Sequence, residues 1–73
     1  LLLSEAELNR EYYCIGVKDS SSEFLKYLDK QKIALGSTFK VIEKESFDDT
    51  LTVEVNAQEK IISNKIANNL YVQ

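Results

Sequence analysis

The chain has 73 residues, 44% of them hydrophobic, which is enough for one small domain but not for two. Its net charge is −3, and its basic residues are scattered, which disfavours direct nucleic-acid binding. No apolar run reaches the roughly 18 residues of a membrane span. The only cysteine, Cys14, has no partner for an intrachain disulfide, so we expect a reducing, cytoplasmic setting.

The first ten residues mix apolar and acidic side chains without a clear period. We predict an entry segment here, with one helical turn at residues 5–8. It is not a signal peptide, because no basic stretch precedes its three leucines. The chain contains no methionine and begins within an apolar pattern. We therefore expect residues 1–73 to be a single domain cut from a longer polypeptide.

The first strand is predicted at 12–17, where the sequence YYCIGV alternates between two faces. Gly16 within this strand indicates a bulge or a close backbone approach, which a small, curved barrel needs. Cys14 is interpreted as a small buried hydrophobic residue. The chain has no histidine and no second cysteine that would build a nucleophilic or soft-metal site with it.

A helix is predicted from about residue 21 to residue 32. Ser20 and Glu23 have the spacing of a capping box, in which a hydroxyl and a carboxylate each accept from a backbone N–H. One apolar stripe follows, made of Phe24, Leu25 and Leu28. Two further apolar residues are expected to pack as the chain turns, Ile33 and Leu35. Gly36 then supplies the permissive backbone that leads into the next strand.

The stretch from Thr38 to Val55 is predicted as a hairpin of two alternating strands. Asp48 and Asp49 lie in the polar turn between the strands, because their short side chains favour turns. Phe47, in the same turn, is expected to fold back over an open end of the barrel. The expected core combines this hairpin with the helices and consists of Phe39, Val41, Leu51, Val53, Val55, Leu28 and Ile66.

Three short elements are predicted after the hairpin. A turn at 56–58 leads to a strand at 60–62, and Ser63 caps one helical turn at 64–67 before a final strand at 70–72. Five short strands with one inserted helix predict a mainly β fold, a small SH3-like barrel. A ferredoxin-like sandwich would need a second full helix, for which residues 63–69 are too few.

The sequence contains no catalytic motif that we can identify. It lacks a glycine-rich phosphate loop, histidine-based triads and metal-binding cysteine and histidine spacings. The adjacent carboxylates Asp48 and Asp49 are expected to point apart on a solvated turn, so they do not form an acid–base pair. We expect no enzymatic activity.

Three segments carry a resemblance to a known family. The first is the helix and its exit, with Phe24, Leu25, Tyr27, Leu28, Ile33, Leu35 and Gly36. The second is the hairpin turn, with Ser46, Phe47, Asp48, Asp49, Leu51, Thr52 and Val53. The third is the closing segment, with Ile66, Ala67, Leu70 and Val72. In order and spacing they resemble the FeoA-type SH3-like domain that ends many metal-dependent repressors of the DtxR and MntR kind. Two departures, Ala34 where proline is usual and Ala57 where a turn glycine is common, affect turns and leave the core positions intact.

The resemblance implies a C-terminal regulatory domain of an iron- or manganese-dependent transcriptional repressor. Such repressors bind Fe²⁺ or Mn²⁺ through other domains, dimerise and place a helix-turn-helix on DNA. This chain would then contact the other domains of its parent, without a cofactor, nucleic-acid contact or membrane contact of its own. In some members the SH3-like domain also lends two oxygen ligands to an ancillary metal site. The nearest positions here are Asp19, Ser20 and Glu23. Asp19 and Glu23 supply carboxylate oxygens, although their spacing is four rather than three and Glu23 also has a capping role open to it.

Two other functions stay open. A stand-alone FeoA-like accessory protein of ferrous iron transport would share the fold. An SH3-type module that binds proline-rich peptides would need clustered aromatic residues, whereas the four tyrosines of this chain are dispersed and it has no tryptophan. The parent reading frame separates the first two functions, because a repressor would carry roughly 140 further residues upstream, the size of one more domain.

Overall fold

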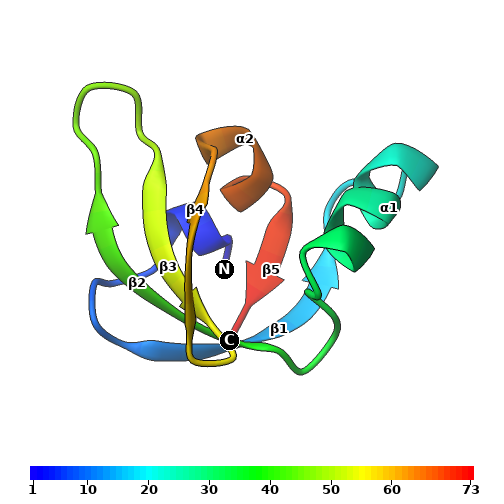
Figure 1. Cartoon of the computed structure of the whole chain (residues 1–73), viewed down its shortest axis with the longest axis horizontal. Coiled ribbons are helices and arrows are strands. Elements are labelled where there is room, and N and C mark those ends of the chain that lie inside the picture. The colour runs from blue at the N-terminus through cyan, green and yellow to red at the C-terminus, as the bar shows by residue number, and fades with distance from the viewer.

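The computed structural model describes all 73 residues and contains one five-stranded sheet in the order β4-β3-β2-β1-β5. The elements in chain order are the 3₁₀ turn η1 (Leu3–Glu5), β1 (Glu11–Val17), α1 (Ser22–Lys30), β2 (Thr38–Lys44), β3 (Leu51–Val55), β4 (Gln58–Ile62), α2 (Asn64–Ala67) and β5 (Leu70–Val72). The strands pair antiparallel, and Figure 1 shows the sheet strongly curved, with α1 at one side. The predicted small, mainly β, SH3-like fold is confirmed.

The central hairpin of β2 and β3 forms as its alternating pattern predicts. Phe39 lies opposite Val55 and Val41 opposite Val53, so one face of the hairpin is wholly apolar and buried. Six of the seven predicted core residues are buried. The exception is Ile66, which is half-buried, because α2 turns the small side chain of Ala67 inward instead.

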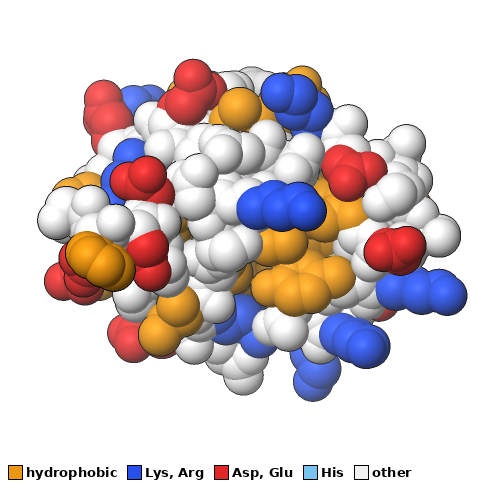
Figure 2. Space-filling view, turned by 90° about the horizontal axis from the view of Figure 1, so that it is seen from above, with side chains coloured by type: hydrophobic (Ala, Val, Ile, Leu, Met, Phe, Trp, Pro, Cys, Tyr) orange, Lys and Arg blue, Asp and Glu red, His pale blue; other side chains and the backbone are white.

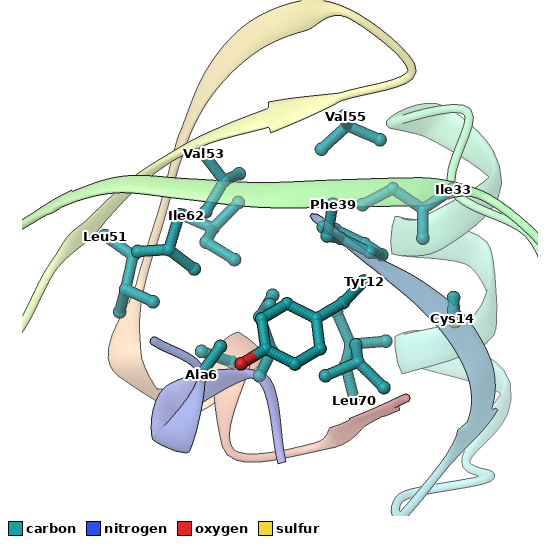
Figure 3. Close-up of a cluster of buried hydrophobic side chains, with 14 of the residues drawn as sticks. Ala6, Tyr12, Cys14, Ile33, Phe39, Leu51, Val53, Val55, Ile62 and Leu70 are labelled. Atoms are coloured by element: carbon teal, nitrogen blue, oxygen red, sulfur yellow. The ribbon is translucent and has the colours of Figure 1, made fainter. Parts of the chain in front are cut away.

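The core contains one large aromatic ring from each of β1 and β2. Phe39 is fully buried, and the ring of Tyr12 crosses the centre of the cluster (Figure 3). The Tyr12 hydroxyl reaches the segment around Ala6, where it accepts a hydrogen bond of 3.0 Å from the backbone N–H of Glu7. This bond satisfies a polar group that burial would otherwise penalise.

Strand β1 changes partners halfway along its length. Residues 11–13 pair with β2, whereas Cys14 and the residues after it pair with β5. The register shifts between Cys14 and Gly16, so the predicted bulge is confirmed. A bulge bends and twists its strand, which lets β1 leave one neighbour and join the other.

The N-terminal segment lies beside β5. Its helical turn is η1 at Leu3–Glu5, so the prediction of a turn at 5–8 was wrong by two to three residues. Leu3, the first residue of the turn, is fully buried, which fixes the turn at this position. The backbone nitrogen of Leu1 donates to the carbonyl of Val72 (3.1 Å), and the N–H of Val72 donates to the carbonyl of Leu1 (2.8 Å). The two ends of the chain are therefore joined.

Two apolar residues that we expected to pack are exposed. Phe47 does not fold back over the sheet, since 94% of its surface is exposed, and Leu35 is 73% exposed. At Phe47 the cause is a tight hairpin end in which Asp49 has a φ of 59°. Helix α1 also ends at Lys30, two residues earlier than predicted. Lys32, with a φ of 59°, turns the chain, so that Ile33 is buried while Leu35 points outward.

The turn between β3 and β4 has two consecutive left-handed residues, Asn56 (φ 49°) and Ala57 (φ 70°). Such a turn suits Asn-Gly, and alanine is strained at its second position because its Cβ approaches the backbone. We expect Ala57→Gly to raise the free energy of unfolding by about 0.5–1 kcal/mol, as measured by urea denaturation.

The control is Ala34→Gly, at an exposed position without a positive φ. There the added freedom of the unfolded chain should lower stability by a few tenths to about 1 kcal/mol. Equal effects of the two glycines would contradict the strain at Ala57.

Candidate functional site

The loop between β1 and α1 contains the two residues predicted as metal ligands. Asp19 is half-buried, and its Oδ1 accepts a hydrogen bond from the backbone N–H of Ser21 (2.9 Å). Ser21 in turn caps α1, because its Oγ accepts from the N–H of Phe24 (3.3 Å). Together these bonds shape the loop and start the helix one residue after the cap.

The predicted capping box of Ser20 and Glu23 was wrong. Ser21 is the capping residue, and the third residue after it is Phe24, which has no carboxylate to complete a capping box. The backbone N–H of Ser21 donates to Asp19 instead. Glu23 is exposed in the first turn of α1, where the helix dipole favours its negative charge. Its carboxylate has no hydrogen-bond partner within the chain that would compete with a ligand.

Asp19 and Glu23 therefore lie at the same end of α1, with carboxylate oxygens of the kind that Mn²⁺ and Fe²⁺ accept. One oxygen of Asp19 already accepts from the backbone. No group of three or more histidine, cysteine, aspartate or glutamate side chains comes together as a metal site in this chain. Two carboxylates fit one part of a coordination shell of about six oxygens, and the other ligands would have to come from outside.

An apolar groove lies between α1 and β1, which we call the α1–β1 groove. It has a volume of about 520 Å³ and is lined by Cys14, Ile15, Gly16, Val17, Leu25, Leu28, Asp29, Ile33, Ala34 and Leu35. Asp29 is its one charged lining residue, and no aromatic side chain lines it. The sequence did not predict this groove, because Leu25 and Leu35 were assigned to the packed interior. The signal that could have found it was the number of apolar residues on and just after one short helix.

Cys14 forms part of the inner wall of the α1–β1 groove. Its side chain is only 4% exposed, and its Sγ donates a weak hydrogen bond to the carbonyl of Gly16 (3.9 Å). Burial raises the pKa of the thiol above its ordinary value of 9.0, and the bond to Gly16 only partly opposes this effect. The thiol is therefore protonated and unreactive at neutral pH, as its interpretation as a small hydrophobic residue requires.

The raised pKa of Cys14 implies that the folded state loses stability as the pH rises into the alkaline range. Because the folded state holds the thiol proton more tightly than the unfolded chain, its stabilising contribution is complete below about pH 9. It is lost as the pH rises through the ordinary pKa and the higher folded pKa. Between pH 8 and pH 10.5, urea denaturation should therefore show a larger loss of stability for the wild type than for Cys14→Ala. Equal losses would contradict the prediction.

The end of the β2–β3 hairpin presents its carboxylates to solvent. Asp48 and Asp49 are both exposed, and the Oδ1 of Asp48 accepts from the N–H of Thr50 (3.0 Å). This hydrogen bond lowers the pKa of Asp48 below its usual value. Asp48 therefore stays charged at neutral pH in an open, wet position and lacks the raised pKa of a general acid.

The charged surface has no large patch of one sign on the face that Figure 2 shows. Acidic and basic side chains both occur there, around one hydrophobic area right of centre and several smaller ones. The net charge of −3 also opposes the phosphate contacts that produce non-specific DNA affinity. No helix of the structure is both long and apolar enough to cross a membrane.

Comparisons with solved structures find the same fold in two kinds of protein, a larger repressor and a small FeoA protein. A crystal structure of ScaR with bound Zn²⁺ matches at 27% identity and a TM-score of 0.88, covering 100% of this chain but 36% of the ScaR chain. ScaR with bound Cd²⁺ matches at 29% identity with the same TM-score. The FeoA protein from Chlorobium tepidum matches at 18% identity and a TM-score of 0.85, covering all of this chain and 69% of that protein. No curated protein matches the sequence.

This chain thus spans about a third of ScaR but most of FeoA from Chlorobium tepidum. The structure of the latter supports the shared fold alone, since its identity is low. The family model described as "FeoA domain" matches residues 1–73, the whole chain. The protein belongs to the FeoA domain family.

Proposed function

We propose that this chain is the C-terminal regulatory domain of a metal-dependent, DNA-binding transcriptional repressor. The observation that carries the proposal is the 27–29% identity with ScaR over the full length of this chain, against 16–18% for the two FeoA-type structures. ScaR is described as a manganese-activated repressor. The manganese regulator SloR shares the fold, at 18% identity and a TM-score of 0.85. The metal of the parent would then be Mn²⁺ or Fe²⁺.

In this role the domain acts through protein contacts within a cytoplasmic parent that binds DNA as a dimer. The DNA-binding and principal metal sites belong to other domains, because this chain has a net charge of −3 and no cluster of three metal-ligating side chains. Asp19 and Glu23 at the start of α1 supply up to two ligands of an ancillary metal site, with the remaining oxygens contributed by the parent. The domain thereby favours the metal-bound, DNA-binding conformation.

The test begins with the parent gene, which should encode an upstream part about twice as long as this domain, with a winged-helix sequence. In that full-length protein, replacing Asp19 with Asn and Glu23 with Gln should raise the Mn²⁺ concentration needed for operator binding between about 5- and 150-fold. Fluorescence anisotropy with labelled operator DNA measures this shift. The matched control, Glu54→Gln with Glu59→Gln, removes the same charge from paired positions on β3 and β4 and should shift it less than twofold.

The isolated 73-residue chain should bind Mn²⁺ more weakly than micromolar by calorimetry, and duplex DNA more weakly than roughly 10 μM at physiological salt. Micromolar Mn²⁺ binding that Glu23→Ala abolishes would replace the regulatory role with a self-contained metal site. Tight DNA binding by the isolated chain would contradict the assignment of DNA binding to other domains of the parent.

The alternative function is a stand-alone FeoA-like accessory protein of ferrous iron transport. It is supported by the FeoA protein from Chlorobium tepidum and the FeoA-like protein from Clostridium acetobutylicum, of which this chain covers 69% and 84%. A parent gene without the upstream winged-helix region would favour this function. The third function, binding proline-rich peptides, is disfavoured because no aromatic residue lines the α1–β1 groove.

A further inference from the structure

The tip of the β2–β3 hairpin, residues 45–50, has no part in the proposed function. We call it the hairpin tip. Phe47 at this tip has 94% of its surface in water, the largest exposure of any large apolar side chain here. The tip is ordered by its own hydrogen bonds: the N–H of Asp49 donates to the carbonyl of Glu45, and the N–H of Phe47 to the Glu45 carboxylate. A partner that covers Phe47 would therefore gain apolar burial at a small cost in conformational entropy.

The charge around Phe47 is strongly negative. Four exposed carboxylates lie within four residues of it in sequence, on Glu43, Glu45, Asp48 and Asp49. The one nearby cation is Lys44, whose Nζ donates to the carbonyl of Ser4 (3.0 Å). A surface that accepts the hairpin tip must therefore combine an apolar hollow with positive charge.

The α1–β1 groove has this combination. Its wall is apolar, with Ile15, Leu25 and Leu35 all at least 42% exposed. Four exposed lysines directly neighbour lining residues in the sequence: Lys18 after Val17, Lys26 after Leu25, Lys30 after Asp29 and Lys32 before Ile33. Against them stands one lining carboxylate, Asp29. The groove and the hairpin tip thus match in two respects: both expose apolar side chains, and their surrounding charges are opposite in sign.

We infer that the hairpin tip of one copy of this chain docks in the α1–β1 groove of a second copy, with Phe47 as the anchor. The two surfaces lie at opposite sides of the molecule in Figure 1, so a chain does not reach its own groove. The contact is head-to-tail, which leaves one tip and one groove free for further copies. A single hairpin tip covers less area than a standard protein interface, so the association is weak and reversible.

The test uses the 73-residue chain at concentrations from roughly micromolar to millimolar, followed by sedimentation equilibrium and amide NMR spectra. We expect the average mass to rise with concentration, with shifts confined to the hairpin tip and the α1–β1 groove. Phe47→Ser and Leu35→Ser should each weaken association at least tenfold. Ile61→Ser is the matched control, since Ile61 on β4 is 72% exposed, like Leu35 at 73%, but lies outside both surfaces, and it should leave association unchanged.

A mixture of Phe47→Ser and Leu35→Ser distinguishes this specific contact from nonspecific association. Phe47→Ser keeps an intact groove and Leu35→Ser keeps an intact tip, so the mixture should form a one-to-one pair that grows no further. All three positions are exposed, so NMR spectra should show folded variants. A wild type that stays monomeric at millimolar concentration, an effect of Ile61→Ser equal to the other two, or a mixture that does not pair would each overturn the inference.

Discussion

Replacing Phe39 with alanine is expected to remove a quarter or more of the domain's free energy of unfolding. Phe39 is fully buried on β2, between Tyr12 of β1 and Val55 of β3. Truncating a buried phenylalanine costs about 3–5 kcal/mol, because apolar burial is lost and a cavity remains. A domain of this length has a total stability of only about 4–11 kcal/mol. Urea denaturation followed by circular dichroism should show a midpoint lowered by about a quarter or more.

The matched control is Phe47→Ala, which removes the same atoms from a side chain that is 94% exposed in the monomer. At micromolar concentration this change should alter the free energy of unfolding by no more than about 0.5 kcal/mol. A Phe39→Ala protein with a wild-type midpoint would mean that the core repacks around the missing ring, contrary to the packing in Figure 3.

Replacing Leu70 with alanine should have the second-largest effect, about 2–5 kcal/mol. Leu70 is fully buried on β5, a strand of only three residues that pairs with β1. Because β5 has so few backbone bonds, its packing depends on Leu70 and Val72. Hydrogen exchange should show that the variant loses protection first in β5 and at the N–H of Val72, which bonds to the N-terminal segment.

Leu35→Ala provides the comparison for Leu70, since it removes the same side chain from a site that is 73% exposed. It should change stability by less than about 0.5 kcal/mol and leave hydrogen exchange in β5 unchanged. If Leu70→Ala instead lowered protection evenly over all strands, β5 would be part of one cooperative unit and not a separable edge.

The strands were predictable because their signal is local. Alternation of apolar and polar residues in β2 and β3 specifies which face is buried, whatever lies beyond the hairpin. Gly16 marked the bulge for the same reason, since a glycine inside a strand weakens regular pairing and often accompanies a bulge. The short helix α2 was also found at its observed residues, because Ser63 accepts from the N–H of Ile66 as a capping residue should.

Phe47 and Leu35 were not predictable in this way, because a pattern identifies an apolar residue but not what covers it. Their exposure depends on backbone turns at Asp49 and Lys32, whose positive φ angles arise at residues other than glycine. The helix cap was misplaced by one residue for a related reason. Three consecutive serines offer three possible caps, and the hydrogen bond from Ser21 to Asp19 decides among them.

The candidate site was predictable only in part. The resemblance to FeoA-type domains pointed to Asp19 and Glu23, but only the structure shows that Glu23 is not occupied by a capping bond. The α1–β1 groove could not be predicted from the chain, since its walls come from β1, from α1 and from the segment after the helix. Such a surface depends on tertiary packing, which no single segment encodes.

The hydrogen bonds between Leu1 and Val72 have a consequence for how this chain could be cut and rejoined. They close a loop of nearly the whole chain, so the entropy of that closure must be overcome each time the domain folds. A circular permutant with a short glycine linker from Gln73 to Leu1, opened between Asp48 and Asp49, would make this closure covalent. The opening would fall in an exposed turn, where a broken backbone is best tolerated. In such a permutant β5 and the N-terminal segment would fold as neighbours in sequence, and β2 and β3 would become the two ends of the chain.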